Sequence, residues 1–186
     1  MNDLSKNKLM MLIFIASESF FFITLIISYV YYSRPGGTLS ESAQYLDVTK
    51  TGIFTFFLLS SSLTIEIADK KLHKGKRKGM LTWLWISILL GVVFLVGQGL
   101  EYATLIEEKI TISQNIFGSA FFTLTGFHGL HVFIGLLALI ILAGIIASKK
   151  YKTVEYDAFN TATVYWHFVD AVWVVVFSVV YIGSIL

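Results

Sequence analysis

The sequence predicts an all-α membrane protein, built as a bundle of five transmembrane helices. Of its 186 residues, 56% are hydrophobic and 16% are aromatic, well above the composition of a soluble domain. Apolar runs long enough to cross a hydrocarbon core of about 30 Å, which takes about 20 helical residues, occur five times. The chain has no cysteine, so a disulfide framework, a thiolate metal site and a covalently attached c-type haem are excluded.

The first span covers about residues 9–32. Lys6 and Lys8 precede it, as basic residues precede the apolar core of a signal peptide. The span is longer than such a core, and no small-residue cleavage site follows it. We therefore expect it to stay in the mature protein as a helix.

The other four spans are separated by connectors too short to hold a soluble domain, so we expect residues 1–186 to form one transmembrane domain. The second span is only just long enough to cross, and the fourth is long enough to tilt or to extend beyond the bilayer. These spans lie at about 51–68, 79–104, 116–147 and 160–186.

The distribution of Lys and Arg predicts the orientation in the membrane. If the N-terminus is cytoplasmic, eleven of these cations fall on the cytoplasmic side, whereas Arg34, Lys50 and Lys109 are the three on the other side. This positive-inside bias places the N-terminus in the cytoplasm and the C-terminus outside. The densest group, which also suits anionic lipid headgroups, consists of Lys70, Lys71, Lys74, Lys76, Arg77 and Lys78.

Ionisable side chains inside these apolar runs are the candidate functional residues, because a charge at the centre of a bilayer helix costs at least about 2.5 kcal/mol. At 1.5 Å per residue, Glu18 and Asp170 lie about 15 Å from the cytoplasmic edge. The two histidines of the fourth span reach a similar level from the outer edge, so these four residues are close enough in depth to meet. Glu66 and Glu101 lie at span ends, where water and headgroups tolerate a carboxylate.

Two pairs of these residues share a helix face, because His128 and His131 are spaced i,i+3, as are His167 and Asp170. Such a face must point into the bundle rather than at lipid tails. We expect these four residues to form an interhelical polar network, with glycines near the first pair allowing close helix packing. For Glu18, a proton-carrying or lipid-associated role and a purely structural role both stay open.

The polar residues also allow other interpretations. A His-x-x-His pair could bind a metal, but the Glu-x-x-His repeats of di-iron bundles are absent and no two spans offer matched ligand sets. We therefore expect these residues to form hydrogen bonds between helices rather than a metal or cofactor site. The rival function is a small proton-coupled transporter, which the lack of an internal repeat disfavours, and a third possibility is an assembly scaffold without a proton role.

Four segments of the chain carry a family resemblance. They are ASESFFF, GLEYATLIEEKITISQNIFGS, FGSAFFTLTGFHGLHVFIG and YWHFVDAVWVVVFSVVYIGS, in that order. Together they resemble subunit III of the haem-copper terminal oxidases, the cytochrome c and quinol oxidases. The mitochondrial subunit has seven transmembrane helices, whereas this chain begins near the equivalent of the third and so resembles the five-helix bacterial form. The lipid-filled cleft of the seven-helix form is therefore not expected intact, and Glu18 matches the family's acid beside that lipid.

The resemblance implies an accessory, non-redox subunit of a bacterial respiratory oxidase, a multi-pass protein of the plasma membrane. The complex would reduce oxygen to water and move protons outward, using cytochrome c or, alternatively, quinol. Haem and copper would belong to the catalytic subunit, which this chain would stabilise while supporting proton uptake. The implied partners are subunit I by direct packing, subunit II and other subunits, and membrane lipids, including a bound phospholipid, but no nucleic acid.

Overall fold

The computed structural model describes residues 3–32, 46–113, 116–148 and 155–183. Within these ranges the chain is helical and contains no strand. Five helices are long and apolar enough to cross a membrane, which confirms the predicted all-α class. The elements are α1 (Asp3–Tyr32), α2 (Val48–His73), α3 (Arg77–Glu107), α4 (Ile116–Ala147), α5 (Glu155–Phe177) and the π-helical turn η2 (Ser178–Ile182).

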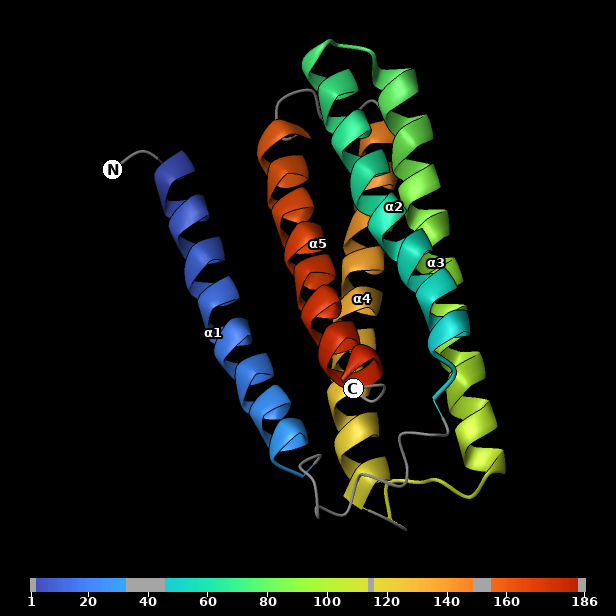
Figure 1. Cartoon of the computed structure of the whole chain (residues 1–186). Helices are drawn as coiled ribbons and strands as arrows, with labels where there is room; N and C mark the ends of the chain where they lie inside the picture. The colour runs from blue at the N-terminus through green and yellow to red at the C-terminus, as the bar shows by residue number, and fades with distance from the viewer. Residues whose placement is uncertain (1–2, 33–45, 114–115, 149–154, 184–186) are drawn as a thin grey trace.

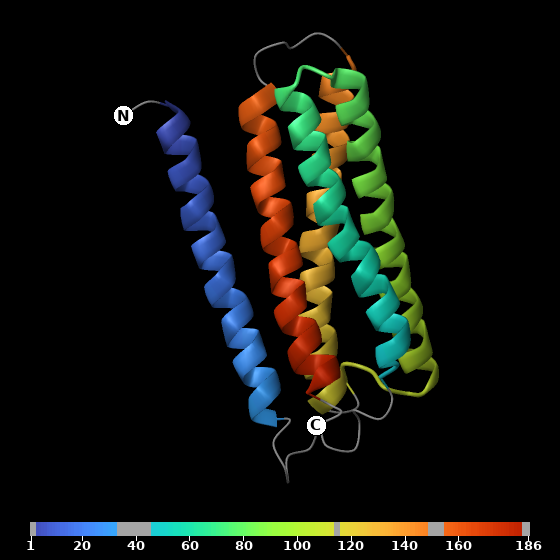
Figure 2. The ribbon, with the colours of Figure 1, turned by 45° about the horizontal axis from the view of Figure 1, so that its top comes forward.

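The helices run alternately up and down (Figures 1 and 2). The first helix begins at the end of the bundle that holds the α2–α3 turn, and η2 ends at the opposite end. Several cations behind the orientation prediction, Arg34, Lys149, Lys150 and Lys152, lie outside the described residues, as do the side chains of Lys6 and Lys8. Which end faces the cytoplasm stays a prediction.

The second helix extends beyond the span expected from hydropathy at both ends, since it begins at Val48 rather than about 51 and ends at His73 rather than 68. Charged side chains explain the extra turn at its end. Glu66 pairs with Lys70 at 3.1 Å and Asp69 lies 3.3 Å from His73, both at i,i+4 spacing. Such pairs, and basic residues near a helix C-terminus, stabilise a polar helical turn that hydropathy alone does not register.

Both α2 and α3 are followed, two residues after their last residue, by a residue with left-handed backbone geometry. After α2 this residue is Gly75 (φ 66°), and the N–H groups of Gly75 and Lys76 donate to the carbonyls of Leu72 and Lys71. After α3 it is Lys109 (φ 62°), with matching bonds from Lys109 and Ile110 to Ile106 and Leu105. Each set of bonds is a Schellman motif.

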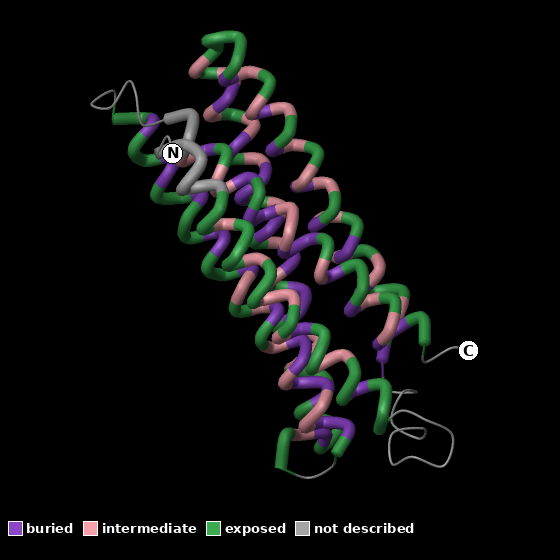
Figure 3. The backbone as a smooth tube through the Cα atoms, turned by 90° about the vertical axis from the view of Figure 1, so that its left-hand side faces the viewer, coloured by how far each residue is buried: buried purple, intermediate pink, exposed green. Residues whose placement is uncertain are grey.

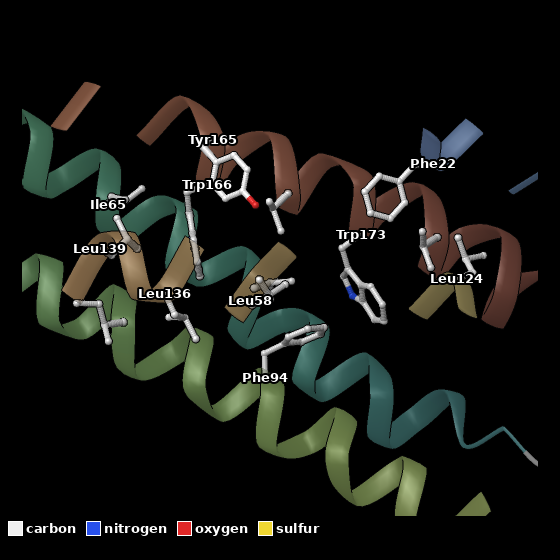
Figure 4. Packing of buried hydrophobic residues seen from close by; sticks show 14 of the residues in the cluster. Phe22, Leu58, Ile65, Phe94, Leu124, Leu136, Leu139, Tyr165, Trp166 and Trp173 are labelled. Atoms are coloured by element: carbon white, nitrogen blue, oxygen red, sulfur yellow. The ribbon is translucent and has the colours of Figure 1, made fainter. Parts of the chain in front are cut away.

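The core contains two fully buried tryptophans from α5, Trp166 and Trp173 (Figure 4). Each indole N–H reaches a hydroxyl on α2: Trp166 Nε1 donates to Ser61 Oγ at 2.8 Å and Trp173 Nε1 to Thr55 Oγ1 at 2.9 Å. A Cβ at Gly135 would lie 2.9 Å from the Trp166 ring. The absence of a side chain at this α4 position therefore makes room for the indole, as expected for a small residue at a helix contact.

The first helix is the least packed of the five. It contacts α4 and α5, but only 6% of its apolar window is buried, against 33–39% in the other spans. In Figures 1 and 2 it stands at one side of the α2–α5 bundle. Exposed positions line the outward sides of the helices in Figure 3, with buried positions where helices meet.

Candidate functional site

The structure joins Glu18 of α1 to His131 of α4. Glu18 Oε2 lies 3.1 Å from His131 Nε2, and the two side chains are 24% and 12% exposed. The other ring nitrogen of His131, Nδ1, lies 2.7 Å from the carbonyl oxygen of Phe127. On the α5 side, the Tyr165 hydroxyl donates to the His131 carbonyl at 3.1 Å. The pair thus lies where α1, α4 and α5 meet.

The hydrogen-bond partners of His131 indicate where the protons of this pair lie. A backbone carbonyl only accepts, so the contact with Phe127 requires a hydrogen on Nδ1. If the imidazole is neutral, Nε2 is an acceptor and Glu18 supplies the proton; if the imidazole is charged, Nε2 donates to an ionised Glu18. In both forms one proton lies between the two groups and the pair is neutral overall, which suits apolar surroundings.

A second polar cluster joins α2 to α5. Ser62 Oγ lies 3.0 Å from His167 Nδ1 and donates to Asp170 Oδ2. The structure places the Ser62 hydroxyl between the His167 ring and the Asp170 carboxylate. A hydroxyl can accept one hydrogen bond while it donates another, so Ser62 can link His167 to the buried Asp170.

His128 does not take part in the polar network that the sequence predicted. Its side chain is fully buried, and neither ring nitrogen has a hydrogen-bond partner within the part of the chain that the structure describes. The imidazole instead stacks on the Trp173 indole, with ring centroids 4.6 Å apart and planes at 28°. The i,i+3 spacing puts His128 and His131 on one broad face, but one packs into the core and the other turns toward α1.

The four residues expected at one level therefore separate into different surroundings. Glu18 pairs with His131, Asp170 bonds to Ser62, and His128 packs among aromatic rings. The reason is that a helix face spans more than 100°, so residues three apart can meet different neighbours. Ser62 was missed by the sequence reasoning, although three consecutive serines within an apolar span, residues 60–62, were a signal for it.

The two acids at span ends differ from each other. Glu66 is exposed and pairs with Lys70, as a surface carboxylate does. Glu101 accepts from the Thr51 hydroxyl at 2.9 Å and from the Tyr181 hydroxyl at 2.8 Å, which joins α3 to α2 and to η2. It also lines a cavity of about 380 Å³. Its place at a span end predicted only an acid tolerated near the headgroups, because its partners lie 50 and 80 residues away in the sequence.

The polar side chains do not cluster in a way that suits a metal ion within the part of the chain that the structure describes. Across residues 3–32, 46–113, 116–148 and 155–183, no three His, Asp or Glu side chains are grouped so that they could hold a metal ion. The two clusters contain one imidazole each, and the carboxylates of both are engaged in hydrogen bonds. Their chemistry is that of proton-sharing hydrogen bonds.

Comparison with known proteins identifies the family. The model of the family "Cytochrome c oxidase subunit III" matches residues 5–185. The cytochrome c oxidase subunit 3 of Corynebacterium diphtheriae is 35% identical over 173 residues, covering 91% of this chain and 84% of that protein. The Thermostichus vulcanus protein of the same name is 36% identical over 175 residues, 92% and 85% of the two chains. The cytochrome c oxidase subunit 3 of Synechocystis sp. is 34% identical over 174 residues, covering 91% of this chain and 72% of that protein.

The matched residues include all five spans and both polar clusters. They also include the four segments on which the resemblance rested, so that resemblance is confirmed. A small proton-coupled transporter gains no support from these matches. The chain belongs to the cytochrome c oxidase subunit III family and is a subunit III of a haem-copper oxidase.

Proposed function

We propose that this chain is the accessory, non-redox subunit of its oxidase and that the Glu18–His131 pair exchanges a proton beside membrane lipid. The observation that supports this is the shared proton that the hydrogen-bond pattern places between Glu18 and His131. Glu18 is also partly exposed on the least packed helix, where lipid or water can approach it. Such a pair can pass its shared proton from one group to the other without burying a net charge.

The finer points of this proposal follow from the family. The relatives are named for cytochrome c oxidase, which favours cytochrome c over quinol as electron donor. Haem and copper would lie in the catalytic subunit I, against which this chain would pack together with subunit II and other subunits. The chain would span a bacterial plasma membrane with its N-terminus in the cytoplasm, where it would stabilise subunit I and support proton uptake.

A structural role is proposed for the other polar residues. Ser62, His167 and Asp170 connect α2 to α5 through a hydroxyl that both accepts and donates. Buried polar groups linked in this way favour one register between two helices. His128 adds aromatic packing rather than a hydrogen bond.

Two substitutions at Glu18 test the proton role. Glu18→Gln keeps a donor that can reach His131 Nε2 but has no acidic proton, whereas Glu18→Ala removes both. We expect both variants to assemble with the oxidase, and both to turn over more slowly or to lose activity severalfold sooner. Steady-state oxygen uptake and proton release by the purified complex in vesicles measure this. A carbodiimide, which attacks protonated carboxyls, should inhibit the parent complex but neither Glu18 variant.

The matched control is Glu66→Gln, which changes a carboxylate that is exposed and paired with Lys70. It should leave turnover, its duration and carbodiimide inhibition unchanged. If Glu18→Gln behaves like the parent while Glu18→Ala loses activity, Glu18 is a structural link between α1 and α4, and the proton role is wrong.

A further inference from the structure

The cavity beside Glu101 is distant from the Glu18–His131 pair in the fold, because it lies between the first turns of α2 and the last turns of α3. At 1.5 Å per residue, Glu101 lies about 9 Å before the end of α3, so the cavity is at the depth of headgroups and the adjoining acyl chains. The residues that line it include Asp47, Lys50, Thr51, Phe54, Leu100 and Glu101. A cavity of about 380 Å³ is within the size range of ligand sites.

The Glu101 carboxylate is held in place but has free acceptor positions. Thr51 donates to Oε1 and Tyr181 donates to Oε2, whereas an ionised carboxylate can accept about four hydrogen bonds. The π-helical turn η2, closed by the bond from the Gly183 N–H to the Ser178 carbonyl, is what presents Tyr181 to Glu101. Turns of this kind often occur at functional sites. Two acceptor positions of Glu101 are left for a donor inside the cavity.

The other two charges of the cavity lie at the start of α2. Asp47 uses both oxygens within the chain: Oδ1 accepts from the Lys50 backbone N–H at 3.0 Å, and Oδ2 lies 2.9 Å from Lys50 Nζ. The Lys50 ammonium has three hydrogens, and its side chain is 76% exposed. Lys50 therefore retains donors for a second anion, such as a phosphate.

The apolar wall of the cavity continues onto the outer face of the helix pair. Ile53 and Leu100 line the cavity and are 53% and 60% exposed. Exposed apolar side chains on a membrane-spanning helix are suited to contact with acyl chains. An occupant that enters from the bilayer can place its polar end beside Glu101 and Lys50 while its acyl chains lie along these two residues.

We propose that this cavity binds a phospholipid with a primary ammonium headgroup, of the phosphatidylethanolamine class. The ammonium donates to the free acceptor positions of Glu101, and the phosphate accepts from Lys50. Two acids and one base make the site net negative when all are ionised, which disfavours a lipid with net negative charge. A choline headgroup carries no N–H donor, so it cannot bond to Glu101.

Native mass spectrometry of the purified oxidase complex, containing the full chain, tests the proposal. The complex is exchanged into mixed micelles of phosphatidylethanolamine, phosphatidylcholine and phosphatidylglycerol with identical acyl chains, and the lipids retained by this subunit are identified by mass. We expect the ethanolamine lipid to be retained about tenfold over the choline lipid, since a hydrogen bond to a charged group corresponds to roughly that factor.

The variants separate the two contacts of the headgroup. Glu101→Gln should remove most of the preference for ethanolamine over choline, and Lys50→Gln should weaken retention of both lipids, because both carry the phosphate. Glu66→Gln, at the opposite end of α2, should change neither. If Glu101→Gln does not assemble, the exposed Lys50→Gln decides the matter.

Several results would overturn the proposal. Equal retention of ethanolamine and choline lipids by the parent complex, or a preference for phosphatidylglycerol, would each contradict it. An unchanged ethanolamine preference in an assembled Glu101→Gln complex would do the same, as would unchanged retention in Lys50→Gln. None of these outcomes bears on Glu18, so the test is independent of the proposed proton role.

Discussion

His128 shows how a buried polar residue can contribute through its ring alone. Its imidazole stacks on Trp173 and lies 5.9 Å, centroid to centroid, from the Phe94 ring. Without a hydrogen-bond partner, a buried polar atom costs free energy relative to an apolar group of the same shape. Packing of the ring against its aromatic neighbours is the favourable contribution.

Replacing His128 therefore has a predictable effect on stability. His128→Phe keeps the ring stack and removes the unpaired nitrogens, so the free energy of unfolding should stay within about 1 kcal/mol of the parent or rise. His128→Ala leaves a cavity and should lower it by at least about 2 kcal/mol. Unfolding in mixed detergent micelles, followed by circular dichroism, measures both. A similar loss in the two variants would mean that the imidazole has a polar partner.

Asp47 caps the N-terminus of α2 and is 44% exposed. The Lys50 side chain and its backbone N–H both bond to this carboxylate and hold its pKa below the ordinary value of 3.8. The folded state therefore binds a proton less readily than the unfolded state does. The stabilisation by Asp47 is complete above pH 3.8 and is lost as the pH falls through the lowered pKa of the folded state.

Two uncharged replacements of Asp47 separate the pH dependence of this carboxylate from that of the other titratable groups. Asp47→Ala should lower the free energy of unfolding by about 1 kcal/mol at neutral pH, and its difference from the parent should shrink below pH 3.8. Asp47→Asn still caps the helix but cannot titrate, so its unfolding should show a weaker dependence on acid. Detergent unfolding curves at several pH values check this. Identical pH profiles for the parent and Asp47→Asn would contradict the assignment.

At the scale of whole elements, the ends of α2 and α3 share one backbone geometry with different residues. Gly75 adopts the left-handed conformation at little cost because it has no Cβ. Lys109 has a Cβ, so the same conformation costs it free energy. The Schellman bonds and the burial of Ile110 and Leu105 offset that cost after α3. A hydrophobic contact between these two positions commonly accompanies the motif.

Exchanging the residue types should change stability in opposite directions. Gly75→Ala should lower the free energy of unfolding by about 1 kcal/mol, and Lys109→Gly should raise it by a similar amount. A Cβ at Gly75 meets no atom within 4 Å, so its effect reports the backbone alone. Denaturation of the two single variants and the double variant measures this. If both substitutions lower the free energy of unfolding, the Lys109 side chain contributes more stability than its left-handed backbone conformation costs.

At the scale of the whole molecule, five crossings place the α2–α3 turn and the end of α3 on opposite sides of the membrane (Figure 1). The basic residues around that turn predict that it faces the cytoplasm. Because the natural chain has no cysteine, single cysteines report each side without background. Two exposed helix-capping positions with ordinary backbone geometry, Lys74 and Glu108, mark the two ends.

A membrane-impermeant maleimide should label Glu108→Cys in intact cells. It should label Lys74→Cys only after the membrane is permeabilised, since that position is expected to face the cytoplasm. The cysteine-free parent is the control for both. Labelling of Lys74→Cys but not Glu108→Cys in intact cells would reverse the orientation.

Much of the fold was predictable from the amino-acid sequence alone. The fourth span was expected at 116–147 and is observed as Ile116–Ala147, because an unbroken apolar run of at least about 20 residues is typical of a membrane-spanning helix. Charged ends were less predictable, as the extra turn of α2 after Ala68 shows. The family was also predictable, because the quoted segments lie within the residues that the family model matches.

The arrangement of the polar residues was decided only by the tertiary structure. Spacing along one helix places residues on a face, but the partner of each residue depends on the depth and rotation of the neighbouring helix. That is why Ser62 stands between His167 and Asp170, why His131 meets Glu18 while His128 meets Trp173, and why Glu101 joins Thr51 to Tyr181. Apolar burial in lipid sets which segments cross the membrane, whereas hydrogen bonding between helices sets which polar groups share a site.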